Sequence, residues 1–97
     1  MNLRLVQFNL GPGRRPAAQA IADQIVPAIR AQKGCERCEF YGNEASGDYG
    51  LVALWTSVQA ADAASSVISP MLHAAVTTAE AKGRPSIRLF EVYEPKG

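Results

Sequence analysis

Residues 49–56, with the sequence Tyr-Gly-Leu-Val-Ala-Leu-Trp-Thr, decide the fold of this chain. The centre of the stretch, Leu51–Trp55, is apolar at every position. A strand with one solvated face alternates apolar and polar residues, whereas a strand covered on both faces does not. We therefore predict a strand over Tyr49–Thr56 whose two faces are both buried.

The segments on either side of this strand predict two helices and three further strands. The Gly-Pro-Gly turn at 11–13 ends an extended apolar segment, and Pro16 suits the first turn of a helix. Pro27 is expected to kink or divide that helix, because it lacks a backbone donor and crowds the preceding turn. Ser57 is expected to cap the second helix, and Ser69-Pro70 to restart it. The predicted strands are Leu3–Leu10, Cys35–Tyr41, Tyr49–Thr56 and Ser86–Glu94, and the predicted helical segments are Ala17–Lys33, Ser57–Val67 and Ser69–Gly83.

The order of these elements, β-α-β-β-α-β, is that of the α+β ferredoxin-like folds. It predicts one domain over residues 1–97, with a four-stranded antiparallel sheet and both helices on one face. Three strands nevertheless carry large apolar residues on both sides; Leu3 and Leu5 oppose Val6 and Phe8, for example. An exposed apolar sheet face would favour aggregation. We therefore predict a homodimer in which a second copy covers that face.

The charge balance argues against several classes of partner. The chain contains ten Lys and Arg residues and nine Asp and Glu residues, which gives a formal net charge of +1. Proteins that bind nucleic acid or anionic membranes concentrate basic charge, so neither partner is expected. No apolar run approaches the roughly 20 residues that span a bilayer, and the N-terminal residues lack the layout of a signal peptide. We expect a cytoplasmic protein.

An ordered set of motifs runs along nearly the whole chain: the 11–13 turn, Pro27, Lys33–Cys35, Phe40–Glu44, Leu51–Ser57 and Ser69-Pro70. Together they resemble the antibiotic biosynthesis monooxygenase family. The resemblance implies a dimeric α+β barrel with a pocket between sheet and helices in each subunit. Members of that family include cofactor-independent oxygenases of aromatic polyketides and quinols, and enzymes that degrade haem with an Asn, a Trp and a His. Because His73 does not fall at the haem-ligand position, no cofactor is expected here.

Trp55 and His73 are the first candidates for a site. The Trp55 ring could stack on a flat aromatic substrate, although a strand this apolar equally predicts a core residue. Histidine is the side chain that titrates nearest neutral pH, which makes His73 the default acid–base candidate. Helical spacing instead aligns His73 with Thr77 and Glu80, a pattern typical of a surface position.

Further polar groups on strands complete the candidate set. Arg88 lies between Ile87 and Leu89, and a charge within a sheet needs a partner or a ligand. With His73, Asn9 and Arg88 are the catalytic candidates. Tyr41, Tyr49 and Tyr93 join Trp55 as candidates for binding the substrate, since each could orient a carbonyl or phenol.

Cys35 and Cys38 have the spacing of a CxxC motif, but they enter a strand rather than open a helix. Residues three apart in a strand point to opposite faces, and a single His supplies too few further ligands for zinc. We expect two unpaired, buried cysteines and no metal site.

Two functions remain open from the sequence. The first is a cofactor-independent monooxygenase acting on a small aromatic compound: a phenol, an anthrone or a quinol. The second is a non-catalytic ligand-binding or regulatory dimer of the same fold, binding a small aromatic or apolar ligand. Fold does not imply function, so the site must decide between them.

Overall fold

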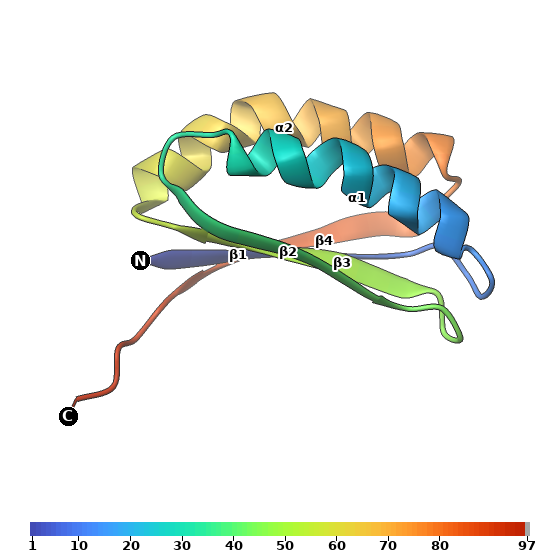
Figure 1. Ribbon diagram of the computed structural model, residues 1–97, viewed down its shortest axis with the longest axis horizontal. Helices are drawn as coiled ribbons and strands as arrows, with labels where there is room; N and C mark the ends of the chain where they lie inside the picture. Colours follow the sequence, from blue (N-terminus) through green and yellow to red (C-terminus); the bar gives the residue numbers. More distant parts are fainter. Residues whose placement is uncertain (97) are drawn as a thin grey trace.

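The computed structural model describes residues 1–96, and Gly97, the last residue of the expected domain, lies outside them. Its element order confirms the predicted β-α-β-β-α-β arrangement (Figure 1). The elements are β1 (Asn2–Asn9), α1 (Arg15–Arg30), β2 (Cys35–Asn43), β3 (Asp48–Trp55), α2 (Val58–Thr78) and β4 (Lys82–Glu91).

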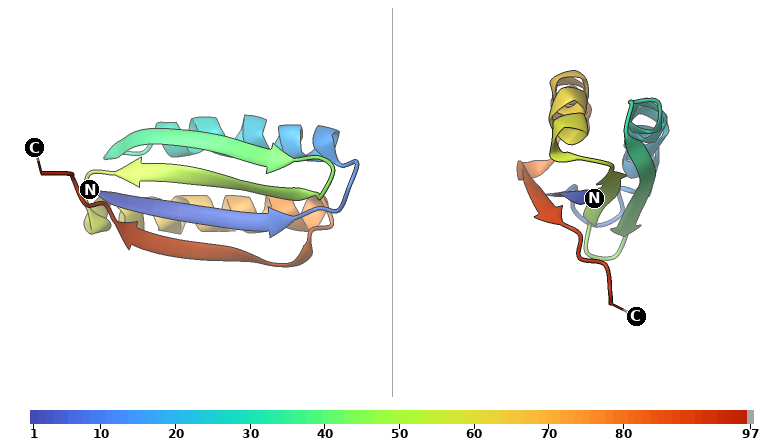
Figure 2. Two further views of the ribbon diagram at one scale, coloured as in Figure 1. Left: turned by 90° about the horizontal axis from the view of Figure 1, so that it is seen from below. Right: turned by 90° about the vertical axis from the view of Figure 1, so that its left-hand side faces the viewer.

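The four strands form one antiparallel sheet in the order β2-β3-β1-β4. Both helices lie on the same face of this sheet, α1 on the β2 side and α2 on the β1 side (Figure 2). The α+β ferredoxin-like fold and its single helix layer are therefore confirmed.

The register explains why the central strands are apolar on both faces. Val6 lies opposite Leu51 and Ile87 on the face that the helices cover, which we call the inner face. Its neighbour Leu5 lies opposite Val52 on the other, outer face. Because successive side chains alternate between faces, β1 and β3 each supply apolar residues to both layers.

The inner face and the two helices enclose the core. Each fully buried large aliphatic residue contributes about 1.5–3 kcal/mol through removal of its surface from water. The outer face keeps an apolar centre that no helix or strand of residues 1–96 covers (Figure 1). The buried core residues on the inner side include Val6, Phe8, Leu10, Ile21, Ile25, Ile29, Leu51, Trp55, Leu72 and Val76. The apolar residues on the outer face are Leu3, Leu5, Val52, Leu54 and Phe90.

The second helix is not divided, and the prediction of a restart at Ser69-Pro70 was wrong. Pro70 lies inside α2 with its ring exposed to solvent. Buried Ala64 and Leu72 hold the helix against the sheet on either side of the proline. This packing outweighs the loss of one backbone hydrogen bond. Pro27 likewise lies inside the undivided α1, between buried Val26 and Ile29.

The end of α2 and the start of β4 also differ from the prediction. Glu80 takes the left-handed conformation directly after the helix, with φ of 57°, whereas Gly83, with φ of 73°, lies within β4 and does not end the helix. β4 then begins at Lys82 and includes Gly83 and Pro85, four residues before the expected start. Proline is tolerated because β4 is an edge strand with an irregular register in this region.

Candidate functional site

An apolar cavity lies between α2 and the inner face of the sheet. It offers about 30 Å³ to the centre of a water molecule, which is room for one or two waters. Sheet residues form its floor and α2 forms its roof. The lining residues are Arg4, Val6, Ile29, Leu51, Ala53, Trp55, Ala64, Ser65, Ile68, Ser69, Leu72 and Ile87.

Arg4 brings a positive charge to this apolar wall. It occupies an inner-face position of β1 between Ala53 of β3 and Leu89 of β4, and its side chain is 17% exposed. Nη1 donates to the Ala61 carbonyl at 3.3 Å, and Nη2 lies 3.6 Å from the Asp62 carboxylate. The third donor, Nε, is buried without a hydrogen-bond partner among the described residues. Such a group costs about 1–3 kcal/mol unless it finds an acceptor.

Trp55 forms another part of the same wall. It ends β3, is 2% exposed, and pairs with Asn2 on one side and Cys35 on the other. Its indole Nε1–H is also buried without a partner in the described part of the chain. Trp55 is therefore both a core residue and a cavity residue, as the two interpretations of the sequence allowed. The two residues that carry these unsatisfied N–H donors thus line one cavity.

Two serines on α2 supply the remaining polar atoms of the cavity. Ser65 and Ser69 lie one helical turn apart, and their hydroxyl oxygens are 3.0 Å from each other. The cavity lining contains no Asp, Glu or His. The site can therefore donate hydrogen bonds to an oxygen, but it holds no strong general base.

A groove between α2 and β4 adjoins the cavity. It has a volume of about 490 Å³ and shares Ser69, Leu72 and Ile87 with the cavity. Ile87 points to the inner face yet is 51% exposed, because α2 does not reach over the edge strand. His73 on α2 and Arg84 on β4 line this groove. His73 thus lies at the entrance and not beside the buried donors.

Asn9 is occupied by structural hydrogen bonds. Its Nδ2 donates to the Asp48 carboxylate at 2.8 Å and to the Ser46 carbonyl at 3.3 Å, and its Oδ1 accepts from the Gly11 N–H at 2.8 Å. The bond from Asn9, followed by one from Ser46, lowers the pKa of Asp48. The residue ties the β1–α1 loop to the β2–β3 hairpin, and it does not line the cavity.

Three other predicted residues lie away from the cavity. Arg88 is on the outer face, with its guanidinium carbon 5.5 Å from the centre of the Phe90 ring. Tyr41 is on the outer face of β2, where its ring fills the space beside Gly50. Tyr93 follows β4 and is 82% exposed. The structure does not bring these residues together with Trp55.

Tyr49 lies on the inner face, in an aromatic cluster under α1. Its ring centre is 6.4 Å from those of Phe8 and Phe40, which are 6.1 Å from each other. The ring covers Gly42 on the neighbouring strand. Tyr49 packs the end of the sheet away from the cavity and is absent from its lining.

The two cysteines share one face of β2, contrary to the prediction that they point apart. The register shifts between Cys35 and Arg37, so Cys35 lies opposite Trp55 and Cys38 opposite Ala53, both on the inner face. An extra residue in a strand changes the alternation in this way. Burial raises the pKa of Cys38 to about 11, and it also raises the pKa of Cys35. Both thiols are free, and Cys38 is buried as expected, but Cys35 is only half-buried.

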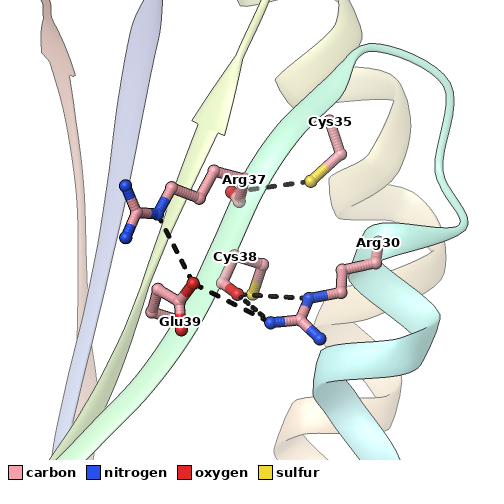
Figure 3. A network of polar contacts seen from close by, with 5 residues as sticks. All are labelled: Arg30, Cys35, Arg37, Cys38 and Glu39. Atoms are coloured by element: carbon pink, nitrogen blue, oxygen red, sulfur yellow. Dashed lines mark hydrogen bonds and ion pairs between the residues drawn. The ribbon is translucent and has the colours of Figure 1, made fainter.

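A cationic side chain seals the edge of β2 beside these cysteines (Figure 3). Arg30 of α1 donates from Nε and Nη2 to the Cys38 carbonyl, at 3.2 and 2.8 Å. Nη2 also lies 3.9 Å from Glu39, whose Oε1 accepts from Arg37 Nε at 3.4 Å. Because an open strand edge invites pairing with another chain, Arg30 protects this one.

Residues 1–96 contain no group of three or more His, Cys, Asp or Glu side chains placed to hold a metal ion. Within the same residues, neither helix has the length and apolar character needed to cross a membrane.

Sequence reasoning missed Arg4, Ser65, Ser69 and Arg84. The sequence does contain a signal for Arg4: it is a charged residue at the same two-residue spacing as Val6 and Phe8, and therefore on the same, inner face of a predicted strand. The argument that a charge within a sheet needs a partner or a ligand named only Arg88. The faces of β4 that Arg84 and Arg88 occupy depend on the irregular start of that strand.

Comparison with solved structures identifies the fold class. The chain superposes on a protein of Deinococcus radiodurans provisionally assigned to the antibiotic biosynthesis monooxygenases, with a TM-score of 0.81 and 14% identity over 100% of this chain and 97% of the other. SnoaB, a cofactor-independent oxygenase of Streptomyces nogalater, gives a TM-score of 0.71 and 14% identity over 97% and 94% of the two chains.

The monooxygenase from the gene ActVA-Orf6 of Streptomyces coelicolor, solved with the ligand nanaomycin D, gives a TM-score of 0.76 and 19% identity over 98% and 89%. No protein-family model matches the chain, and no curated protein matches it significantly. The chain therefore has the fold of the antibiotic biosynthesis monooxygenases, as the sequence resemblance predicted.

Proposed function

We propose that this chain is a cofactor-independent monooxygenase that binds a small planar aromatic compound with one oxygen atom in the cavity. The observation that carries the proposal is that the two residues with buried, unsatisfied N–H groups, Arg4 and Trp55, line one apolar cavity. A phenolate or enolate oxygen would accept from both donors and relieve the cost of their burial. The fold shared with SnoaB and the ActVA-Orf6 enzyme supports the choice of oxygenase chemistry.

The reaction that suits this site is the oxidation by O₂ of the CH₂ group of an anthrone to a carbonyl. Loss of a proton from the substrate gives an anion, which passes one electron to O₂ and leaves a carbon radical and superoxide. These combine to form a C–O bond, and protonation gives a hydroperoxide. Loss of water then breaks the O–O bond, so that the CH₂ group and O₂ become a carbonyl and one water molecule.

Arg4 and Trp55 would act on the first of these steps. Their N–H groups would stabilise the negative charge on the substrate oxygen in a site of low polarity, where such donors are most effective. The Trp55 ring would also contact the flat face of the substrate. Because no strong base lines the cavity, the departing proton would leave through the groove.

The rival function is a non-catalytic dimer that binds the same class of ligand. The absence of Asp, Glu and His from the cavity lining favours it, since the substrate would lose its proton without an adjacent base. Both functions use the same ligand contacts, so binding alone does not separate them.

We further propose that a second copy of the chain covers the outer face. Leu3, Leu5, Val52, Leu54 and Phe90 form an uncovered apolar centre there, and Phe90 is 41% exposed. An isologous dimer would bury this surface sheet against sheet. Arg88 and Tyr41, on the same face, would then lie at the dimer contact.

Oxygen uptake with a panel of anthrones and quinols tests the proposed reaction. We expect turnover above the buffer rate, and a loss of about 100-fold in kcat for Arg4→Gln, the usual cost of removing one donor to a developing oxyanion. Arg15→Gln removes an exposed arginine outside the cavity and serves as the matched control. Saturable binding without turnover would leave the non-catalytic function as the correct one.

A further inference from the structure

The ionisable residues that line the cavity and groove are all basic. They are Arg4 in the cavity and His73 and Arg84 in the groove, and no Asp or Glu lines either space. The whole chain is nearly neutral, with a formal net charge of +1. A concave, partly apolar site lined by one kind of charge concentrates ligands of the opposite charge.

The size of the cavity determines where the rest of a ligand must lie. About 30 Å³ in the enclosed part accommodates an oxygen atom and its immediate neighbours, but it does not accommodate a two-ring aromatic. The groove, at about 490 Å³, has the volume of an ordinary ligand site. A ligand whose oxygen reaches Arg4 and Trp55 therefore has its other end in the groove.

Two elements present polar groups to that other end. His73 and Thr77 lie one turn apart on α2, and Arg84 lies on β4 across the groove. Neither His73 nor Arg84 makes a hydrogen bond or ion pair to a side chain within residues 1–96. Both side chains are exposed and thus free to pair with a ligand.

We infer that the ligand carries an anionic substituent, such as a carboxylate, at the end remote from its buried oxygen, and that Arg84 and His73 recognise it. This inference rests on the proposed function, because it takes the orientation of the ligand from the buried donors. His73 is thereby a specificity residue at the entrance, which accounts for its distance from the enclosed cavity. Arginine suits the role, because its planar fork matches a carboxylate.

Calorimetric titration with two probes tests the inference. The probes are 6-hydroxy-2-naphthoate and its uncharged analogue 6-hydroxy-2-naphthamide, which share ring and hydroxyl group. We expect the native protein to bind the naphthoate more tightly than the amide. Arg84→Gln, which removes a charge, should weaken naphthoate binding by roughly threefold to fivefold, the effect of an exposed ion pair. His73→Gln, which removes the imidazole, should also weaken it. The double variant should lose the preference, while its affinity for the amide stays within twofold of native.

Lys82→Gln is the matched control, because Lys82 is an exposed cation of the same strand outside the groove lining. It should leave both affinities unchanged. Equal affinity of the native protein for the two probes would overturn the inference and leave the proposed function standing. A preference that survives in the double variant would overturn it as well. Failure of both probes to bind would refute the proposed function together with the inference.

Discussion

Replacing Arg4 by methionine separates a functional arginine from a structural one. The change removes a hydrogen bond to the Ala61 carbonyl and a 3.6 Å ion pair to Asp62, whose side chain is 66% exposed. Those losses cost about 0.5–1.5 kcal/mol for the hydrogen bond and about 0–1 kcal/mol for the pair. The change also removes the unsatisfied Nε, whose burial costs about 1–3 kcal/mol.

The two sides nearly cancel, so we expect the free energy of unfolding of Arg4→Met to lie within about 1 kcal/mol of native. Ligand binding should meanwhile be lost. Urea unfolding followed by the fluorescence of Trp55, the one tryptophan in the chain, measures the first quantity. Leu51→Ala, in the same cavity wall, should cost about 2–5 kcal/mol and shows that the assay responds to this region. A loss of more than 2 kcal/mol for Arg4→Met would mean that the arginine holds the fold together and refute our reasoning.

Three further predictions concern other parts of the molecule. Asn9→Ala should raise the lowered pKa of Asp48, measured by NMR titration, because the Asp48 carboxylate loses its main hydrogen bond. In the native protein the ionised carboxylate stabilises the fold above the unfolded-state pKa of Asp48, and this contribution is lost as pH falls. An Asp48 pKa that Asn9→Ala leaves unchanged would contradict the prediction. Iodoacetamide at neutral pH should label Cys35 before Cys38, whose pKa of about 11 keeps its thiol protonated. Because the pKa of Cys38 is raised in the folded state, its effect on stability should be lost only as pH rises above the pKa of the unfolded state. Faster labelling of Cys38 would be inconsistent with its burial. Leu5→Lys on the outer face should convert a dimer to a monomer in sedimentation, and a native mass near 10.4 kDa would contradict the proposed dimer.

The fold was predictable because its signals are local and agree with one another. The apolar centre of β3 and the Gly-Pro-Gly turn before α1 point to the same layered sheet. The errors arose where packing outweighed a local preference. Pro70 continues a helix because Leu72 and Ala64 hold it to the sheet, and Gly83 lies in a strand because an edge tolerates irregular pairing.

The site was less predictable, because residue type was visible but direction was not. Arg4 and Arg88 are both arginines flanked by apolar strand residues, yet one lines the cavity and the other faces the opposite side. The bulge at Cys35 changed the alternation that the sequence argument assumed. Unsatisfied donors such as the Trp55 N–H depend on neighbours from several elements, so a single segment of sequence cannot reveal them.

The indole N–H resonance of Trp55 tests the central claim most directly. One tryptophan gives one such resonance in a ¹H–¹⁵N spectrum, and its proton belongs to a donor that is buried and unpartnered. On saturation with 6-hydroxy-2-naphthoate we predict a downfield shift of this proton, since it gains an oxygen acceptor. 2-Naphthoate, which lacks the hydroxyl group, should leave the shift much smaller. Saturable calorimetric binding of the hydroxylated probe with an unmoved indole resonance would contradict the account.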